Sequence, residues 1–221
     1  MKYSFNRPDF RNLKGEIAER LVNCYIRENV IPLLQKSWDK VIFTPQAWFG
    51  DEVEQNKNKP DYMKIFWRHE EHFFIKNKLF PSQALMVKFK KLTKTLQNAP
   101  DGFLFKLKLT GEHKRLEEAL QELQVSSFRW TDHGYTFDYQ EQNGDELLPI
   151  VDGHIEVIEI KSDKSNLPSH QRASYRNIVK EGYILRFFHV DESLFINNEF
   201  EIEEKLITEP NQIVTFPIKP R

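Results

Sequence analysis

The stretch of residues 144–161 constrains the fold of this chain more than any other part of the sequence. Two apolar runs, residues 147–151 and 155–160, lie on either side of the dipeptide Asp152-Gly153. An Asp-Gly dipeptide between apolar runs is typical of a tight β-hairpin. The second run ends in Glu159-Ile160-Lys161, and the two-residue period of a strand places Glu159 and Lys161 on the same face. We therefore expect a hairpin whose second strand ends in an acid and a base side by side.

The register of this hairpin decides which further acid faces Glu159. A three-residue loop over 151–153 places Asp145 opposite Glu159, whereas a two-residue loop places Glu146 there, because a slip of one residue exchanges the faces. Directly opposed residues lie about 4.5–5.5 Å apart. Either register brings two carboxylates and the ammonium of Lys161 within reach of one cation. Magnesium prefers such oxygen ligands and retains several waters.

An acid, a hairpin and a Glu-x-Lys at the end of an apolar strand resemble the PD-(D/E)xK nuclease superfamily. In that family the Asp and Glu hold magnesium, and the Lys orients or activates the attacking water. The resemblance gives these roles to Asp145, Glu159 and Lys161, although Gly144 stands where the family has proline. It implies an α/β fold with a restriction-endonuclease-like core, in the order helix, mixed sheet, helix and strand.

Three other aspartates are alternatives for the hairpin acid. Asp138 and Asp152 lie close to the motif in the sequence, but Asp152 sits at the predicted turn, about 7 × 3.3 Å along the strand from Glu159. Asp101 follows Pro100, as the aspartate of the family does. A helix predicted over residues 110–123 separates it from Glu159, which makes Asp101 a less favoured interpretation.

A helix is predicted from Asn12 to about residue 28, because apolar residues recur there at helical spacing. At 100° per residue, Glu19 falls at the edge of the apolar arc, from which it can point into a cleft. Residues 14–20 resemble the Lys-Gly-x-x-x-Glu-Arg opening helix of archaeal-type Holliday junction resolvases, which belong to the same superfamily. There the glutamate completes the acidic site. Glu19 matches this glutamate and Glu16 does not.

The sequence after the motif is similar to a second branch of the superfamily, the viral-type replication and repair nucleases. In that branch a Leu-Ser-x-x-Gln-like helix start follows the Glu-x-Lys strand, and residues 167–171 read Leu-Pro-Ser-His-Gln. We expect a helix that is capped by Ser169 or by Ser165 and runs to Lys180, where Glu181-Gly182 ends it, and then a strand over 183–190. Gln171 in the first turn is expected near the strand end that carries Lys161, where it positions the water or the phosphate.

The remaining chain is divided into a core and an insertion. A strand over 38–44 and the motif place the nuclease core in residues 11–48 and 131–221. Residues 50–130 are expected to form an insertion or helical subdomain, with a helix over 82–97, a strand over 103–109 and a helix beginning at Thr110. Alternatively, residues 135–139 form the strand before the motif, and residues 38–44 lie outside the core. Residues 200–207 are expected to form an edge strand.

A basic segment suggests where nucleic acid binds. Six lysines and no acidic residue occur between Phe73 and Pro100. A surface of this kind neutralises phosphates and makes binding depend strongly on salt; the competing interpretation is a solvated helix face over apolar core residues. The candidate phosphate contacts are Lys88, Lys90, Lys91, Lys94 and Arg172.

Composition bounds the class of protein. The chain has 221 residues, a net charge of −1 and a single cysteine, Cys24. One cysteine excludes an intrachain disulfide and a cysteine-based metal site, and fits a reducing, cytoplasmic compartment. No stretch approaches 18 uninterrupted apolar residues, so no membrane span is expected. A net charge near zero means that any DNA-binding surface is a local patch.

The sequence as a whole predicts a magnesium- or manganese-dependent deoxyribonuclease that acts in DNA repair, recombination or replication. Its metal is held by Asp145, Glu159 and, directly or through water, Glu19. DNA is the expected partner, and a homodimer is plausible by analogy with junction-cutting relatives. Two alternatives come from other classes: a non-catalytic nucleic-acid-binding module, and a protein-interaction module whose Glu-x-Lys is a structural ion pair.

Overall fold

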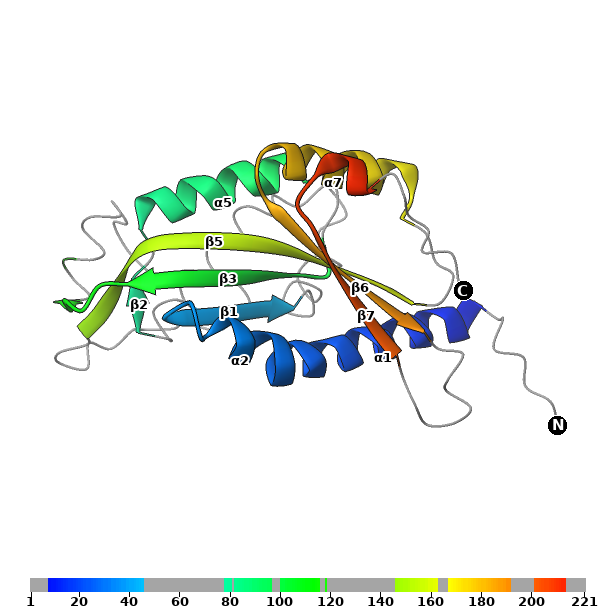
Figure 1. The fold of residues 1–221 in the computed structure, drawn as a ribbon, viewed down its shortest axis with the longest axis horizontal. Coiled ribbons are helices and arrows are strands. Elements are labelled where there is room, and N and C mark those ends of the chain that lie inside the picture. The colour runs from blue at the N-terminus through cyan, green and yellow to red at the C-terminus, as the bar shows by residue number, and fades with distance from the viewer. Residues whose placement is uncertain are drawn as a thin grey trace, which may run out of the picture.

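The computed structural model describes residues 8–45, 78–80, 82–96, 100–115, 118, 146–162, 167–191 and 201–213. They form an α/β structure with a mixed sheet (Figure 1). The helical segments are α1 (Pro8–Tyr25), η1 (Ile26–Val30), α2 (Ile31–Leu34), α5 (Gln83–Thr95), α7 (Ser169–Lys180) and η4 (Pro210–Ile213). The strands are β1 (Lys40–Pro45), β2 (Leu79–Phe80), β3 (Gly102–Leu109), β4 (Lys114–Arg115), β5 (Glu146–Ser162), β6 (Ile184–Asp191) and β7 (Glu201–Ile207).

The main path of the sheet follows the order β1-β3-β5-β6-β7. β5 and β6 are parallel, and the other neighbours on this path are antiparallel. The parallel pair is joined by α7, as a crossover connection requires. The first part of β5 extends beyond the end of β3 and pairs with the short strands β2 and β4 instead.

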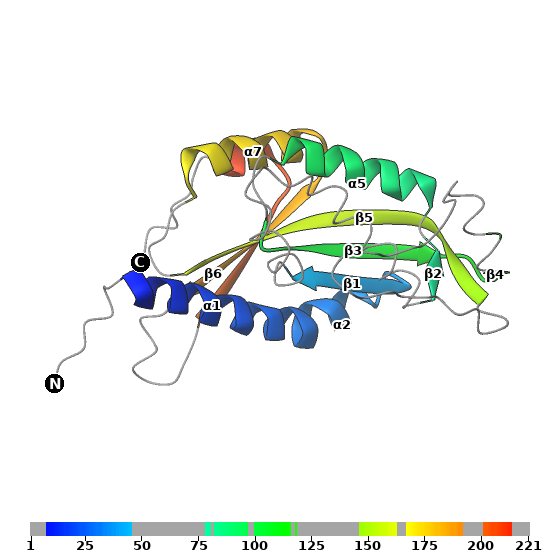
Figure 2. The ribbon, with the colours of Figure 1, turned by 180° about the vertical axis from the view of Figure 1, so that it is seen from behind.

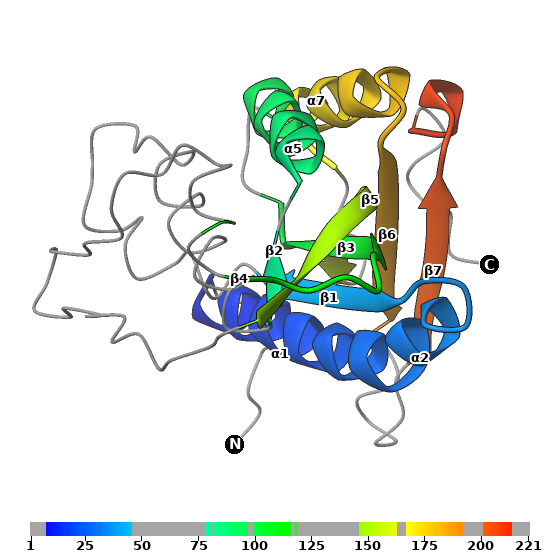
Figure 3. The ribbon, with the colours of Figure 1, turned by 90° about the vertical axis from the view of Figure 1, so that its left-hand side faces the viewer.

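Helices cover both faces of the sheet. α1 lies against one face, and α5 and α7 lie against the other (Figures 2 and 3). Alternate residues of the central strands enter two separate apolar clusters: Leu104 and Ile158 pack with α1, whereas Phe105 and Val157 pack with α5 and α7. A strand that is buried on both faces is apolar on both, which explains the four apolar residues among 155–160. The other two, Glu156 and Glu159, are buried as paired carboxylates.

The predicted hairpin at Asp152-Gly153 is wrong. β5 runs without a turn through this dipeptide, and Gly153 pairs with Leu107 of β3. A Cβ atom at Gly153 would lie 2.7 Å from Cδ1 of Leu85 on α5 and 3.2 Å from Cδ2 of Leu107. The glycine therefore leaves room for the side chain of Leu85, which a larger residue would force to move, and it does not mark a turn of the chain.

The prediction that residues 50–130 form an insertion outside the core is wrong for the part that contains β3. β3 lies within this range, yet it pairs with β1 on one side and β5 on the other, so it is a central strand of the sheet. The same pairing makes β1 part of the core, so the alternative that placed residues 38–44 outside it is wrong. Residues 135–139 lie outside the described ranges.

Most helices and strands of the described ranges agree with the sequence. α5 begins after Ser82, whose side-chain oxygen accepts a hydrogen bond from the backbone N–H of Leu85 (3.2 Å), as in a typical N-cap. α7, β6 and the edge strand β7 also match their predicted ranges. The helix predicted from Thr110 is wrong at its start, because β4 pairs with β5 there. Among the described helices, none is long and apolar enough to cross a membrane.

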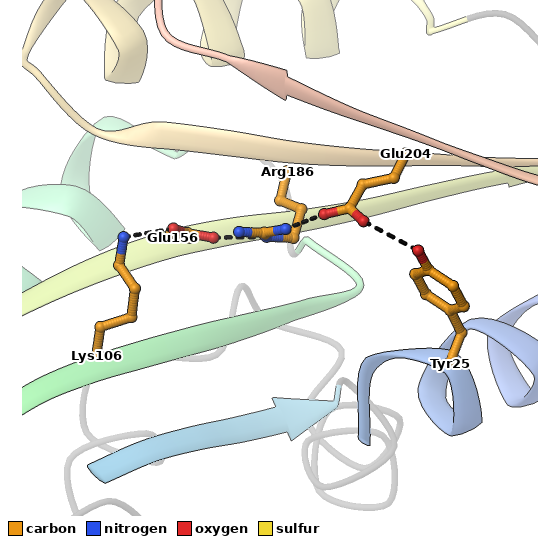
Figure 4. A network of polar contacts seen from close by, with 5 residues as sticks. All are labelled: Tyr25, Lys106, Glu156, Arg186 and Glu204. Carbon is orange, nitrogen blue, oxygen red and sulfur yellow. Dashed lines mark hydrogen bonds and ion pairs between the residues drawn. The ribbon is translucent and has the colours of Figure 1, made fainter. Parts of the chain in front are cut away.

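A chain of buried polar contacts crosses the face of the sheet that α1 covers (Figure 4). Glu156 of β5 contacts Lys106 of β3 and Arg186 of β6, each at 2.6 Å. Arg186 also pairs with Glu204 of β7, which accepts a hydrogen bond from the hydroxyl of Tyr25 on α1 (3.3 Å). Two cations and two carboxylates balance in charge, as a buried network requires. The network therefore links four strands and the helix.

Candidate active site

A pocket of about 380 Å³ lies where β5 continues past the first residue of β3. It is bounded by α1, by the residue that precedes β3, by the end of β5 and by the start of α7. Its lining residues are Gly15, Ala18, Glu19, Asp101, Ile160, Lys161, Ser162, Pro168 and Gln171. Segments separated by more than 150 residues of sequence therefore meet in one pocket.

The β3–β5 ladder positions Asp101. Gly102, the first residue of β3, is the partner of Ile158 in the ladder, and the backbone N–H of Asp101 donates to the carbonyl of Ile158 (3.0 Å). The Oδ2 atom of Asp101 in turn accepts a hydrogen bond from the backbone N–H of Ile160 (2.6 Å). Because Ile160 stands between Glu159 and Lys161, Pro100-Asp101 and Glu-x-Lys are fixed side by side.

Glu159 is held on both of its carboxylate oxygens. The side chain is 1% exposed; Oε1 accepts from the ammonium of Lys161, and Oε2 accepts from the hydroxyl of Tyr175 on α7. A buried carboxylate is stable only when it is paired and hydrogen-bonded. Tyr175 is 1% exposed and fixes the orientation of Glu159. Sequence reasoning placed Tyr175 on this helix without a role; its spacing of four residues from Gln171, on the buried face, is the signal that was missed.

Burial, reinforced by repulsion between neighbouring carboxylates, raises the pKa of two acids in the pocket. Burial, and then the charge of Glu159, raise the pKa of Asp101 to about 8, although Lys161 and the N–H of Ile160 act in the opposite direction. Burial, followed by the charges of Glu16 and Glu159, also raises the pKa of Glu19, against the effect of Lys161. Both shifts have the direction that burial and neighbouring carboxylates give to an acid when no cation is present.

Two further residues lie where the sequence placed them. Glu19 lines the same pocket as Lys161, as expected from its place at the edge of the apolar arc. Gln171 also lines the pocket from the first turn of α7, and its Oε1 atom is buried without a hydrogen-bond partner among the described residues. The guanidinium of Arg172 donates through Nε to the carbonyl of Leu167 (2.8 Å) and fastens the start of α7 beside the pocket.

The hairpin acid needs a correction. Asp145 lies outside the described residues, and its neighbour Glu146 begins β5, thirteen residues before Glu159 in the same strand, or about 43 Å away at 3.3 Å per residue. Since β5 continues without a turn, neither predicted register applies, and Glu146 does not lie opposite Glu159. Asp101 occupies that position instead. In the sequence, Asp101 follows Pro100 and precedes an apolar strand, as the aspartate of the family does. The helix predicted over residues 110–123 favoured the acids nearer the motif.

The predicted basic surface also needs a correction. Lys88 of α5 contacts the carbonyl of Gly153 (3.4 Å) and a carboxylate oxygen of Asp152 (3.7 Å). Gly153 lies seven residues before Ile160 on β5, so Lys88 is on the order of 23 Å along the strand from the pocket. Lys91 pairs with Glu181 (3.5 Å). These two lysines therefore neutralise acidic side chains of the protein itself. Lys94 is exposed in the last turn of α5, and the side chain of Lys90 lies outside the described part.

The donor set suits a hard divalent cation that retains waters. Within the described ranges, no three carboxylate, histidine or cysteine side chains are grouped closely enough to enclose a metal ion. Magnesium does not need such a cage, because one or two carboxylates, several waters and substrate phosphates complete its shell. Asp101 and Glu159 are the adjacent carboxylates, and Glu19 faces the same space. A divalent cation would relieve the repulsion that raises the pKa of Asp101.

Comparisons with known proteins give no relative for this chain. A scan against models of protein families, a search of curated proteins and a search of solved structures each returned no match.

Proposed function

We propose that this chain is a metal-dependent nuclease of the PD-(D/E)xK type that hydrolyses phosphodiester bonds of DNA. One observation carries the proposal: Pro100-Asp101 and Glu159-Ile160-Lys161 lie side by side, joined by the hydrogen bond between Asp101 and Ile160, and Asp101 and Lys161 line one pocket. The order α1, β1, β3, β5, α7 and β6 agrees with the helix, mixed sheet, helix and strand of a restriction-endonuclease-like core. Glu19 and Gln171 lie in the same pocket, as the two resemblances in the sequence imply.

The residues of the pocket have distinct roles in this proposal. A bound magnesium or manganese ion would polarise a phosphodiester oxygen and lower the pKa of a bound water. Asp101 and Glu159 would hold that ion, with Glu19 reached directly or through water. Lys161 would orient the attacking water and stabilise negative charge as it develops on the phosphate. Gln171 would accept a hydrogen bond from the water, because its Oε1 has no partner among the described residues.

Tyr175 acts through Glu159 and is a positioning residue. Its hydroxyl occupies one oxygen of Glu159, and Lys161 occupies the other. This arrangement fixes the carboxylate before any ligand binds, which avoids the cost of ordering a flexible side chain on binding.

The test is incubation of the protein with branched, linear, circular and single-stranded DNA, in magnesium and in EDTA. We expect cleavage of at least one substrate in magnesium and none in EDTA. Lys161→Ala should abolish cleavage, and Lys36→Ala, which removes an exposed lysine after α2, should leave it unchanged. Circular dichroism of both variants checks that the fold is retained.

The same experiment separates the two rival functions. A non-catalytic nucleic-acid-binding module would bind DNA without product in either buffer. A protein-interaction module, in which Lys161 and Glu159 form only a structural ion pair, would neither bind nor cleave it. Absence of cleavage from every substrate at high enzyme concentration in magnesium and in manganese would contradict the proposal.

A further inference from the structure

The face of α7 next to its buried residues carries three cations at a helical spacing. Arg172, Arg176 and Lys180 are four residues apart, so they lie along one side of the helix. Ser174, Tyr175, Ile178 and Val179 form the buried side. Lys180 is exposed, and the two arginines are partly exposed. α7 has no Asp or Glu between its first and last residue.

None of these three cations is neutralised within the described part of the chain. Arg172 uses Nε for the carbonyl of Leu167, and neither Arg176 nor Lys180 forms an ion pair there. Two lysines of α5 behave differently, because Lys88 pairs with Asp152 and Lys91 with Glu181. Glu181, which follows Lys180 in the sequence, is thus engaged by α5 through Lys91 and Thr95. The positive charge of α7 is available for an external partner.

The row formed by Arg172, Arg176 and Lys180 begins beside the pocket. Gln171 lines the pocket, Arg172 is the next residue, and α7 then runs away from the end of β5 and back over the sheet (Figure 1). Eight residues separate Arg172 from Lys180, which corresponds to about 12 Å along the helix axis. One strand of B-form DNA carries a phosphate for about every 3.4 Å of axis, so this length spans about three phosphates.

We infer that Arg172, Arg176 and Lys180 bind the sugar-phosphate backbone of a nucleic acid strand whose scissile bond lies in the pocket. The inference rests on the proposed nuclease function and gives the bound nucleic acid strand a path that leads from the pocket along α7. It replaces the surface that the sequence placed on α5. The net charge of −1 makes such a local surface necessary, since the protein as a whole does not attract a polyanion.

Salt-dependent binding tests the inference without cleavage. Short fluorescein-labelled strands, single and duplex, are titrated with the full chain in EDTA over a range of salt concentrations. The triple variant Arg172→Gln, Arg176→Gln, Lys180→Gln should lower the slope of log Kobs against log salt by about two to three units, about one for each lost phosphate contact. The variant Lys88→Gln, Lys91→Gln removes two charges from α5, at lysines that pair with Asp152 and Glu181, and should leave the slope unchanged.

A double variant, Arg176→Gln with Lys180→Gln, retains the contact of Arg172 with Leu167 and should lower the slope by about one to two units. It keeps the test valid if the triple variant does not fold. An unchanged slope in the α7 variants, an equal loss in the α5 variant, or no binding by the wild-type chain would each overturn the inference. Binding that shows the predicted slopes without any cleavage in magnesium would support the α7 surface and reject the nuclease.

Discussion

Asp101 accepts a 2.6 Å hydrogen bond from the backbone N–H of Ile160, a residue 59 positions later in the sequence. This bond joins the start of β3 to the end of β5 at the point where the β3–β5 ladder stops. It places one carboxylate beside the Glu159-Ile160-Lys161 segment and leaves a pocket between α1 and α7.

Asp101 and the acids at the other end of β5 should differ in their effect on cleavage. We expect Asp101→Asn to reduce DNA cleavage by about 100-fold or more, the scale on which removal of one transition-state-stabilising group acts. Glu146→Gln and Asp145→Asn should leave the rate near that of the wild type, because β5 carries Glu146 away from the pocket. The measurement is the single-turnover cleavage rate in magnesium. Loss of activity in Asp145→Asn with full activity in Asp101→Asn would show that Asp145, and not Asp101, is the metal-binding acid.

The stability of the metal-free protein should fall as the pH rises. The pKa of Asp101 is about 8 in the folded protein, against 3.8 for an unperturbed aspartate. Between these values the folded protein holds a proton that the unfolded chain has released, so the free energy of unfolding decreases with pH. The raised pKa of Glu19 acts in the same direction. Stability is therefore highest at the acidic end of this window and is lost as the pH rises through about 8.

Thermal unfolding in EDTA measures this effect. We expect the Tm to fall by several degrees between about pH 5 and about pH 8, since 1 kcal/mol shifts the Tm of a chain of this size by about 2–4 °C. Asp101→Asn removes the titrating group and should flatten the profile, whereas Glu146→Gln should not. Magnesium should raise the Tm of the wild type most at the alkaline end, because it binds the ionised carboxylates. A Tm that rises over the same pH range in EDTA would contradict the raised pKa of Asp101.

Tyr175→Phe should affect both stability and catalysis. It leaves Oε2 of the buried Glu159 without a donor, which should cost about 1–3 kcal/mol in the free energy of unfolding. Cleavage should fall about 10- to 100-fold through weaker metal binding, as for other residues that orient a metal ligand.

Tyr183→Phe removes an exposed hydrogen bond to the carbonyl of Lys88 and is the matched control. Urea unfolding and the magnesium dependence of the rate are measured; equal effects in the two variants would show that Tyr175 has no positioning role.

Gly153→Ala should destabilise the protein, because its methyl group would lie 2.7 Å from Leu85 of α5. Overpacking of this kind costs about 1–3 kcal/mol. At Gly111, an added Cβ meets no atom within 4 Å, so Gly111→Ala should change the free energy of unfolding little. Urea unfolding of both variants provides the comparison. If Gly153→Ala were neutral while Gly111→Ala destabilised, the close approach of α5 would not explain the glycine.

The sequence determined the local elements that carry the site. Helical periodicity placed Glu19 at the edge of an apolar arc, and the alternation at the end of an apolar run placed Glu159 and Lys161 on one face. Both features depend on residues that are close together in the sequence. They can therefore be predicted without knowing which other segment packs against them. The helix over 82–97, the helix that carries Gln171 and the order of helix and strand after the motif were predictable for the same reason.

Tertiary structure alone decided which acid stands beside Glu159. Asp152-Gly153 has the sequence of a turn, but its glycine is used for helix–sheet packing against Leu85. The strand therefore continues, and its partner is β3 rather than a neighbouring run. Strand pairing over a long sequence separation leaves no local pattern, and for this reason Asp101 was set aside despite its Pro-Asp. The pairing of α5 lysines with Asp152 and Glu181 was hidden for the same reason, since ion pairs between distant elements depend on how those elements pack.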